Sequence, residues 1–225
     1  MITFLLLLFP FALTVYGIWT KEKKDIIPLF CGIMSAVLFC ALKVFLTYSH
    51  RIVPYSFSEN MIYYLLRLSL LPVCILYLLY FFLVKDSSEY KIKSFFPLTA
   101  GFYAVYLPYF IISASEAVYS GYDLFLRPVL YLSFICLCAI SLHYLYKSIK
   151  EKNYLFIAVS ALLLIVAFII PAISDALYAI NYNFSLIVLI DVFYMALTGV
   201  YLLMIFIFSF SKKKFSDKES EQESE

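Results

Sequence analysis

The chain has few of the residues that most metal-binding and catalytic sites require. Its 225 residues include two histidines, His50 and His143, five glycines and one tryptophan. Two distant histidines, with no HExxH or CxxC motif, exclude the usual zinc sites. There is no GxSxG motif and no glycine-rich phosphate loop, and 184–210 contains no lysine to carry a retinal Schiff base. The sequence therefore predicts no metal, no cofactor and no catalytic residue, and an enzyme is not the favoured class.

Scarce glycine and an odd number of cysteines also limit how the chain is held together. All five cysteines fall in long apolar runs, which argues for free thiols and against a disulfide framework. No GxxxG motif is present. We therefore expect helices that pack through leucine, isoleucine and aromatic side chains rather than through close backbone contact.

Long apolar runs account for most of the chain. The composition is 64% hydrophobic, against roughly 45–50% in soluble domains. Seven runs approach the ~20 residues that a membrane-spanning helix needs, and they cover about 2–20, 26–47, 61–84, 94–115, 124–146, 154–175 and 184–210. The sequence predicts an all-α, polytopic bundle of seven transmembrane helices in one domain, 1–211, followed by a disordered charged tail, 212–225.

The lysines predict how this bundle is oriented. They cluster after the first, third, fifth and seventh runs, at Lys21, Lys23, Lys24, Lys85, Lys91, Lys93, Lys147, Lys150, Lys152, Lys212, Lys213 and Lys214. By the positive-inside rule the N-terminus lies outside and the C-terminus is cytoplasmic. We expect a multi-pass protein of the cell (inner) membrane, with the lipid bilayer as its surroundings and no nucleic-acid partner.

The remaining charges gather in the half of the predicted bundle that faces outward. They are Lys43, Arg51, Arg67, Arg127, Glu59, Glu116, Asp123, Asp175 and Asp191. A charge at membrane depth costs roughly 2.5–3.5 kcal/mol on insertion scales, so such groups normally face a partner or a wet cavity. Asp191 lies seven residues into its run, roughly 10 Å deep at the helical rise. Asp123 and Arg127 form an i,i+4 pair that satisfies itself.

Helical spacing places several of these charges on stripes with tyrosines. Asp191 and Tyr194 are three residues apart, and Tyr63 and Arg67 are four apart. The predicted ligand-binding residues are Asp191, Arg67, Lys43, Asp175, Arg127, Glu116, Tyr194 and Tyr63. Arginine suits carboxylate or phosphate recognition, so a small anionic or zwitterionic ligand is expected. The alternative is that the same charges form a structural ion-pair network.

Three prolines lie deep enough in their runs to kink the predicted helices. They are Pro72, Pro108 and Pro171, and such residues are tolerated where neighbouring groups bond the freed carbonyls.

One stretch carries a family resemblance. Residues 59–86, with Arg67, Pro72 and the Phe81–Phe82 end, resemble the third span of the seven-helix sensor modules that precede bacterial kinases and cyclases. The resemblance implies an outward ligand pocket and the same orientation. We expect no output domain after the bundle, and the resemblance then implies signalling through a cytoplasmic or membrane partner.

The function expected from the sequence is therefore ligand binding in an outward-facing polar pocket, as in a sensor or receptor. A small-solute transporter and an intramembrane, lipid-acting enzyme remain as alternatives.

Overall fold

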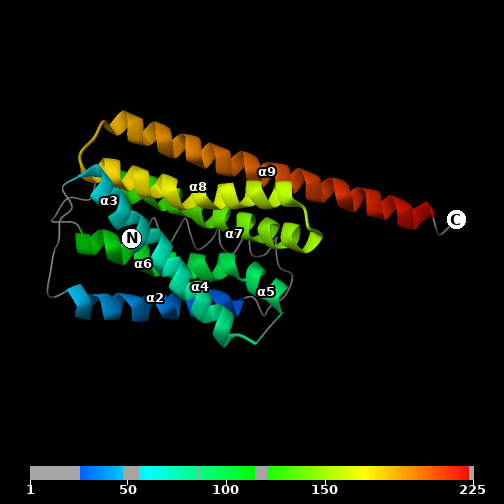
Figure 1. Ribbon diagram of the computed structural model, residues 1–225, viewed down its shortest axis with the longest axis horizontal. Coiled ribbons are helices and arrows are strands. Elements are labelled where there is room, and N and C mark those ends of the chain that lie inside the picture. Colours follow the sequence, from blue (N-terminus) through cyan, green and yellow to red (C-terminus); the bar gives the residue numbers. More distant parts are fainter. Residues whose placement is uncertain (1–25, 48–55, 86, 115–120, 223–225) are drawn as a thin grey trace.

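The computed structural model describes residues 26–47, 56–85, 87–114 and 121–222, with side chains described in these ranges except at 26, 43–47, 113–114 and 205–222. Over these ranges the fold is helical without strands, which confirms the all-α prediction. The elements are α2 (Ile26–Thr47), α3 (Phe57–Tyr64), π-helical η2 (Leu65–Leu70), α4 (Leu71–Leu83), α5 (Ser88–Lys93), α6 (Phe95–Ala114), π-helical η3 (Tyr122–Leu126), α7 (Arg127–Glu151), α8 (Tyr154–Ala179) and α9 (Phe184–Gln222) (Figure 1).

Five helical segments of the described chain are long and apolar enough to cross a membrane. They are Phe57–Leu83, Ser88–Ile112, Tyr122–Glu151, Tyr154–Ala179 and Phe184–Met204, and they correspond to the last five predicted runs. The run 26–47 is also helical, as α2, whereas 2–20 lies outside the described residues. α9 continues as helix to Gln222, through part of the segment expected to be a disordered tail; lysine, glutamate and glutamine there are good helix formers.

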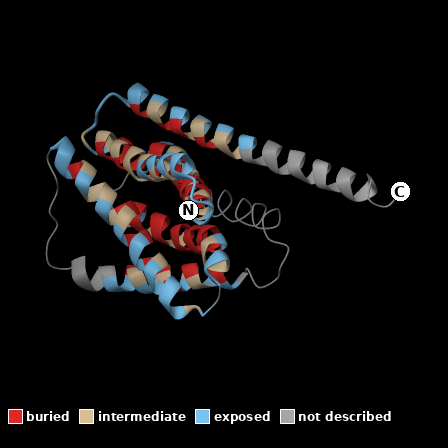
Figure 2. Cartoon of the chain, turned by 45° about the vertical axis from the view of Figure 1, so that its right-hand side comes forward, coloured by how far each residue is buried: buried red, intermediate tan, exposed pale blue. Residues whose placement is uncertain are grey.

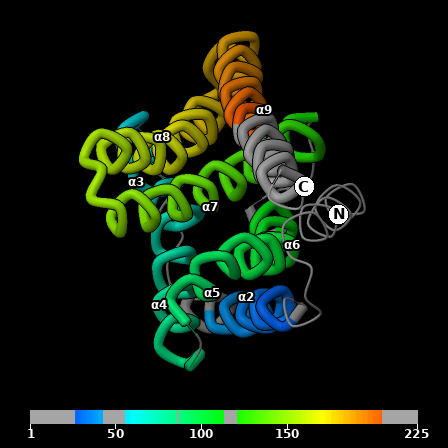
Figure 3. The backbone as a smooth tube through the Cα atoms, turned by 90° about the vertical axis from the view of Figure 1, so that its right-hand side faces the viewer, coloured from blue at the N-terminus to red at the C-terminus, as the bar shows by residue number. Residues whose placement is uncertain are grey.

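The helices pack side by side in a row, with α6 and α7 in its middle (Figure 3). Viewed end-on, α2 lies against α6, and α7 lies between α6 and the α8–α9 hairpin (Figure 3). The continuous helix α3–η2–α4 crosses this row obliquely, contacting α8 near its start and α6 further along (Figure 1). Buried residues line the facing sides of the helices, and exposed ones cover the outer faces of α8 and α9 (Figure 2). Those outer faces carry apolar side chains such as Leu162 and Leu189, as expected of a surface in contact with lipid.

The contact between α2 and α6 depends on two glycines. An added Cβ at Gly32 would lie 2.9 Å from the backbone nitrogen of Phe102 and closer still to the carbonyl oxygen of Leu98. An added Cβ at Gly101 would in turn collide with the carbonyl oxygen of Leu29. The expectation that the helices avoid close backbone contact is therefore wrong for this pair. Each helix contributes one glycine, so no motif within a single helix reveals the contact.

Pro72, in the first turn of α4 just after η2, leaves two backbone carbonyls without a donor, and tyrosines of α6 donate to them. Pro72 has no N–H to donate to the carbonyl of Leu68 four residues earlier, or to that of Arg67 five residues earlier. Tyr103 donates to the Leu68 carbonyl at 2.6 Å, and Tyr106 donates to the Arg67 carbonyl at 2.9 Å. Hydroxyls from a neighbouring helix thus satisfy backbone groups that lipid could not.

The same arrangement recurs at the proline inside α8. Pro171 leaves the carbonyl of Ala167 without its usual donor, and Tyr194 of α9 donates to it at 3.3 Å. The side chain of Tyr194 is fully buried. This hydroxyl therefore ties α9 to the middle of α8.

Candidate functional site

A buried arginine at the start of α7 organises the main polar cluster of the described residues. Arg127 follows η3 directly and lies one turn after Asp123, so the i,i+4 spacing points both side chains to one face. Arg127 Nη1 is 2.5 Å from Asp123 Oδ1. The pairing expected between these two residues is thus confirmed.

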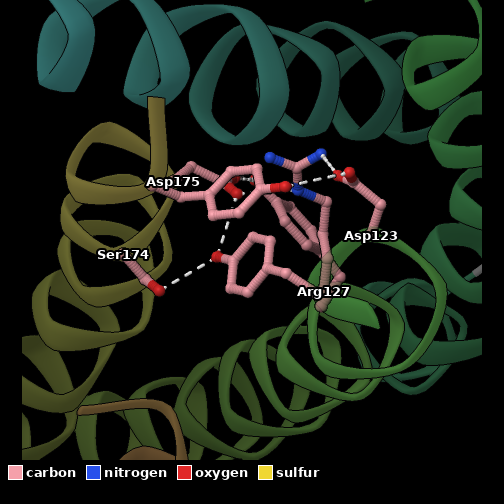
Figure 4. A network of polar contacts seen from close by, with 7 residues as sticks. Asp123, Arg127, Ser174 and Asp175 are labelled. Carbon is pink, nitrogen blue, oxygen red and sulfur yellow. Dashed lines mark hydrogen bonds and ion pairs between the residues drawn. The ribbon is translucent and has the colours of Figure 1, made fainter. Parts of the chain in front are cut away.

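A second carboxylate reaches the same arginine from α8. Arg127 Nε is 2.8 Å from Asp175 Oδ1, and Figure 4 shows Asp123, Arg127 and Asp175 pointing toward one another. The Asp175 side chain is fully buried, whereas that of Arg127 is 5% exposed and that of Asp123 is 12% exposed. Asp175 and Arg127, predicted as members of one site, are therefore in direct contact. Removing one partner of such a buried pair costs about 3–5 kcal/mol.

Three tyrosines complete the hydrogen bonds of the two carboxylates. Tyr131 donates to Asp175 Oδ2 at 2.9 Å, and Tyr122 donates to Asp175 Oδ1 at 3.2 Å. Tyr178 donates to Asp123 Oδ2 at 3.3 Å. We call Asp123, Arg127, Asp175, Tyr122, Tyr131 and Tyr178 the Arg127 lattice.

Aromatic packing encloses the guanidinium of this lattice. The rings of Tyr122 and Tyr178 stack with centroids 4.2 Å apart and an interplanar angle of 19°. Arg127 Cζ lies 5.1 Å from the first centroid and 5.6 Å from the second, within the range of a cation–π attraction. Both edges of the guanidinium thus face carboxylates while two aromatic rings lie nearby. This part of the site matches the structural ion-pair network that the sequence left open as an alternative.

Asp191 of α9 lies beside the lattice and differs from its other carboxylates. It is fully buried, and neither of its carboxylate oxygens has a hydrogen-bond partner among the described residues. Ser174 of α8 faces Asp191 as a donor, although without a hydrogen bond of normal geometry, and the charge of Asp191 interacts with those of Asp175 and Arg127. The Ser174 hydroxyl lies 3.0 Å from that of Tyr122, and Figure 4 shows Ser174 pointing toward the lattice. Ser174 thus faces both Asp191 and the lattice.

Other predicted site residues lie apart from this cluster. Arg67 donates to the hydroxyl of Tyr63 one turn earlier, and its Cζ lies 5.0 Å from the centroid of that ring. No hydrogen bond joins Arg67 to Asp191, although both were predicted as ligand-binding residues. Tyr194 bonds the Ala167 carbonyl. Glu116 and the side chain of Lys43 lie outside the described part of the chain.

The sequence reading missed four members of the polar cluster. Tyr122, Tyr131, Ser174 and Tyr178 were not predicted. A signal was present, because Asp123, Arg127 and Tyr131 follow one another at four-residue spacing and thus share a helical face. On α8, Asp175 and Tyr178 are three residues apart and Ser174 and Tyr178 are four apart, spacings that likewise share a helical face.

Within the described residues, no group of three or more histidine, cysteine or acidic side chains lies close enough together to hold a metal ion through such side chains alone. The five cysteines are free, as predicted.

Comparisons with known proteins return no relative. No family model matches the chain, and no curated protein or solved structure matches it.

Proposed function

We propose that this chain is a sensor-like integral membrane protein that binds a positively charged ligand at Asp191 and responds by moving α9 against α7 and α8. In this proposal the chain spans the cell (inner) membrane seven times, with the N-terminus outside and the C-terminus cytoplasmic. The arrangement would be the one implied by the resemblance to bacterial sensor modules. The observation that carries the proposal is the buried Asp191 carboxylate without a hydrogen-bond partner among the described residues.

A buried carboxylate with no partner is costly enough to need an explanation. Burying an ionised group costs several kcal/mol unless it is paired or neutralised. The one guanidinium nearby, that of Arg127, already bonds Asp123 and Asp175. Three carboxylates thus share one arginine, and Asp191 is the carboxylate that this arginine does not bond. A positive charge from outside the chain would balance it.

This charge balance also refines the expected ligand. An anionic or zwitterionic ligand was expected because arginine suits anions. An anion at the Arg127 lattice would have to displace a carboxylate that is already bonded, whereas a cationic group at Asp191 displaces nothing. The cationic end of a zwitterion remains compatible with the site.

The route from this site to a partner would run along α9. Asp191 lies near the start of α9, and Tyr194 ties the next turn to α8. α9 continues to Gln222, past the lysines at 212–214. A shift of α9 on ligand binding would move this basic segment and whatever partner contacts it. Such a shift requires the ligand to bind the two conformations with different affinity.

The test measures the distance between α8 and α9 at the end remote from Asp191. Spin labels on non-natural residues at Tyr154 and Leu203, both exposed, leave the native cysteines in place. In nanodiscs, the distance distribution should change on exposure to acid, sodium or ethanolamine and should not change with acetate. Asp191→Asn should abolish the change. Glu151→Gln, an exposed carboxyl-to-amide control, should retain it. A distribution that is the same under every condition would refute the proposal.

A transporter is the second candidate, because acidic residues at membrane depth also mark ion and solute routes. The proline interruption of α8 next to Tyr194 is the kind of helix break that such proteins use around a binding site. Uptake of a cationic solute into proteoliposomes, lost in Asp191→Asn, would favour a carrier over a sensor.

A further inference from the structure

We infer that Asp191 and Ser174 form a binding site for one small monovalent cation, either a proton or a sodium ion. The inference rests on the proposed function only in placing the cation at Asp191. It adds the class of the ligand and a route by which its binding reaches the Arg127 lattice.

Burial limits the size of what can bind there. Asp191, Ser174 and Asp175 are each fully buried, so an occupant must fit among closely packed helices without most of its hydration shell. A proton adds no volume. A bare sodium ion needs only a few oxygen ligands, which a carboxylate, a hydroxyl and backbone carbonyls can supply. An organic amine would need the helices to separate.

The groups that surround Asp191 favour a single positive charge. α9 packs against α7 and α8. From α8, Ser174 and Asp175 face Asp191, and from η3 and α7, Tyr122 and Arg127 do so. Arg127 bonds Asp123 and Asp175 but not Asp191, so one added positive charge compensates the single carboxylate that lacks a direct partner among the described residues. Divalent ions prefer several carboxylate oxygens, and the described residues hold no group of three acidic, histidine or cysteine side chains suited to a metal.

Ser174 can report the state of Asp191 to the lattice. Its hydroxyl lies 3.0 Å from the hydroxyl of Tyr122, and either oxygen can be the donor. When Asp191 is charged, Ser174 can turn its hydrogen toward that carboxylate. When a cation neutralises Asp191, Ser174 can donate to Tyr122 instead, and Tyr122 in turn donates to Asp175 at 3.2 Å. Cation binding would thus strengthen the hydrogen bonds that join η3 to α8.

The experiment is infrared difference spectroscopy of the full chain in nanodiscs. The pH is raised once without sodium, with a bulky organic cation as the counterion, and once in a sodium salt. The wild type should lose one carbonyl band of a protonated carboxylic acid as pH rises, and Asp191→Asn should lack this band. Ser174→Ala should keep the band but shift its midpoint. Glu151→Gln should behave as the wild type.

The two salt series separate the ligands. A transition that is the same in both series identifies a proton site. A band that sodium displaces at fixed pH identifies a site for either ion. If the Asp191→Asn spectra equal those of the wild type, the inference is wrong.

A second measurement decides the matter if Asp191→Asn does not fold. A hydrophobic carbodiimide modifies protonated carboxyls within membranes, so mass spectrometry of labelled wild type should find Asp191 modified. Labelling should decrease with rising pH or with sodium. Labelling that depends on neither would overturn the inference.

The outcomes also separate this inference from the proposed function. A cation-dependent band at Asp191 without a change in the α8–α9 distance would leave the site and refute the sensor. A change in the α8–α9 distance with ethanolamine alone, without the band, would support the proposed sensor function and refute the binding of a proton or a sodium ion at Asp191.

Discussion

The glycine contact between α2 and α6 gives a prediction with opposite signs at matched positions. The perturbation is the addition of one methyl group, in Gly101→Ala and in Gly199→Ala. Both residues lie inside helices. An added Cβ at Gly101 collides with the backbone of Leu29, whereas at Gly199 no described atom lies within 4 Å. The two substitutions therefore share the local effect and differ only in the contact.

The size of each effect is set by these surroundings. Alanine is favoured over glycine inside a helix by about 1 kcal/mol, so Gly199→Ala should stabilise the protein by up to that amount. Overpacking costs about 1–3 kcal/mol. The upper end applies at Gly101, because the obstacle is backbone that no rotamer change can move. After the helical gain of about 1 kcal/mol is subtracted from a cost of about 3 kcal/mol, Gly101→Ala should destabilise by about 2 kcal/mol.

The assay is equilibrium unfolding in mixed micelles, titrated with a denaturing detergent and followed by far-ultraviolet circular dichroism. Gly32→Ala should resemble Gly101→Ala. The double variant should cost less than the sum of the two, because once α2 has moved away the second methyl group finds more room. If Gly101→Ala and Gly199→Ala change the free energy of unfolding equally, the close backbone contact is not present and the reasoning fails.

Further predictions concern the tyrosines and the Arg127 lattice. Tyr103→Phe leaves the Leu68 carbonyl unbonded and should destabilise the protein by about 1–3 kcal/mol, or by about 0.6 kcal/mol if the bond behaves as an average interhelical hydrogen bond in a membrane protein. The same unfolding titration measures this loss. If stability does not fall, the Tyr103 hydroxyl does not bond this carbonyl. Tyr194→Phe should cost less than Tyr103→Phe, because its bond to the Ala167 carbonyl is longer, at 3.3 Å against 2.6 Å; a larger loss in this variant would contradict that ranking. Asp175→Ala leaves Arg127 paired with Asp123 alone and the buried hydroxyl of Tyr131 without its acceptor. It should destabilise by about 1–3 kcal/mol for each buried group left unbonded, measured by thermal unfolding in nanodiscs, with Glu151→Gln unchanged.

Hydropathy predicted the helices well because a long apolar helix can be recognised from its length and composition alone. The last five apolar runs are helices that meet both criteria, and α2 occupies the second run, 26–47. The rule holds because only a helix, or a closed barrel, bonds every backbone group internally in lipid. It carries no information about which helices are neighbours.

Arg67 and Asp191 were predicted as members of one site, and their separation shows why a prediction also needs to know which helices are neighbours. Sequence spacing assumes 3.6 residues per turn throughout 61–84, but η2 replaces α-helix with π-helix at Leu65–Leu70. One extra residue in a turn rotates the remainder of the helix by about 100°. A stripe drawn from Tyr63 beyond Arg67 along this helix therefore does not stay on one face. In contrast, the Asp123–Arg127 pair needs only one turn, and its spacing predicted it correctly.

The tyrosines illustrate a further limit and isolate the one unexplained charge. Tyrosines were predicted to bind a ligand, yet Tyr103, Tyr106 and Tyr194 each bond a carbonyl in a proline-interrupted helix. A tyrosine suits this task because its ring packs as an apolar group while its hydroxyl supplies the missing donor. The sequence displays both the prolines and the tyrosines but not their pairing, which depends on helix packing.

Among the described residues, the hydroxyls of Ser69 and Ser141 lack hydrogen-bond partners, as does the carboxylate of Asp191, but the hydroxyls are neutral and cost far less to bury than a carboxylate. Asp191 is thus the buried charge for which this otherwise closely satisfied interior offers no counterpart, and a cation from outside the chain supplies it.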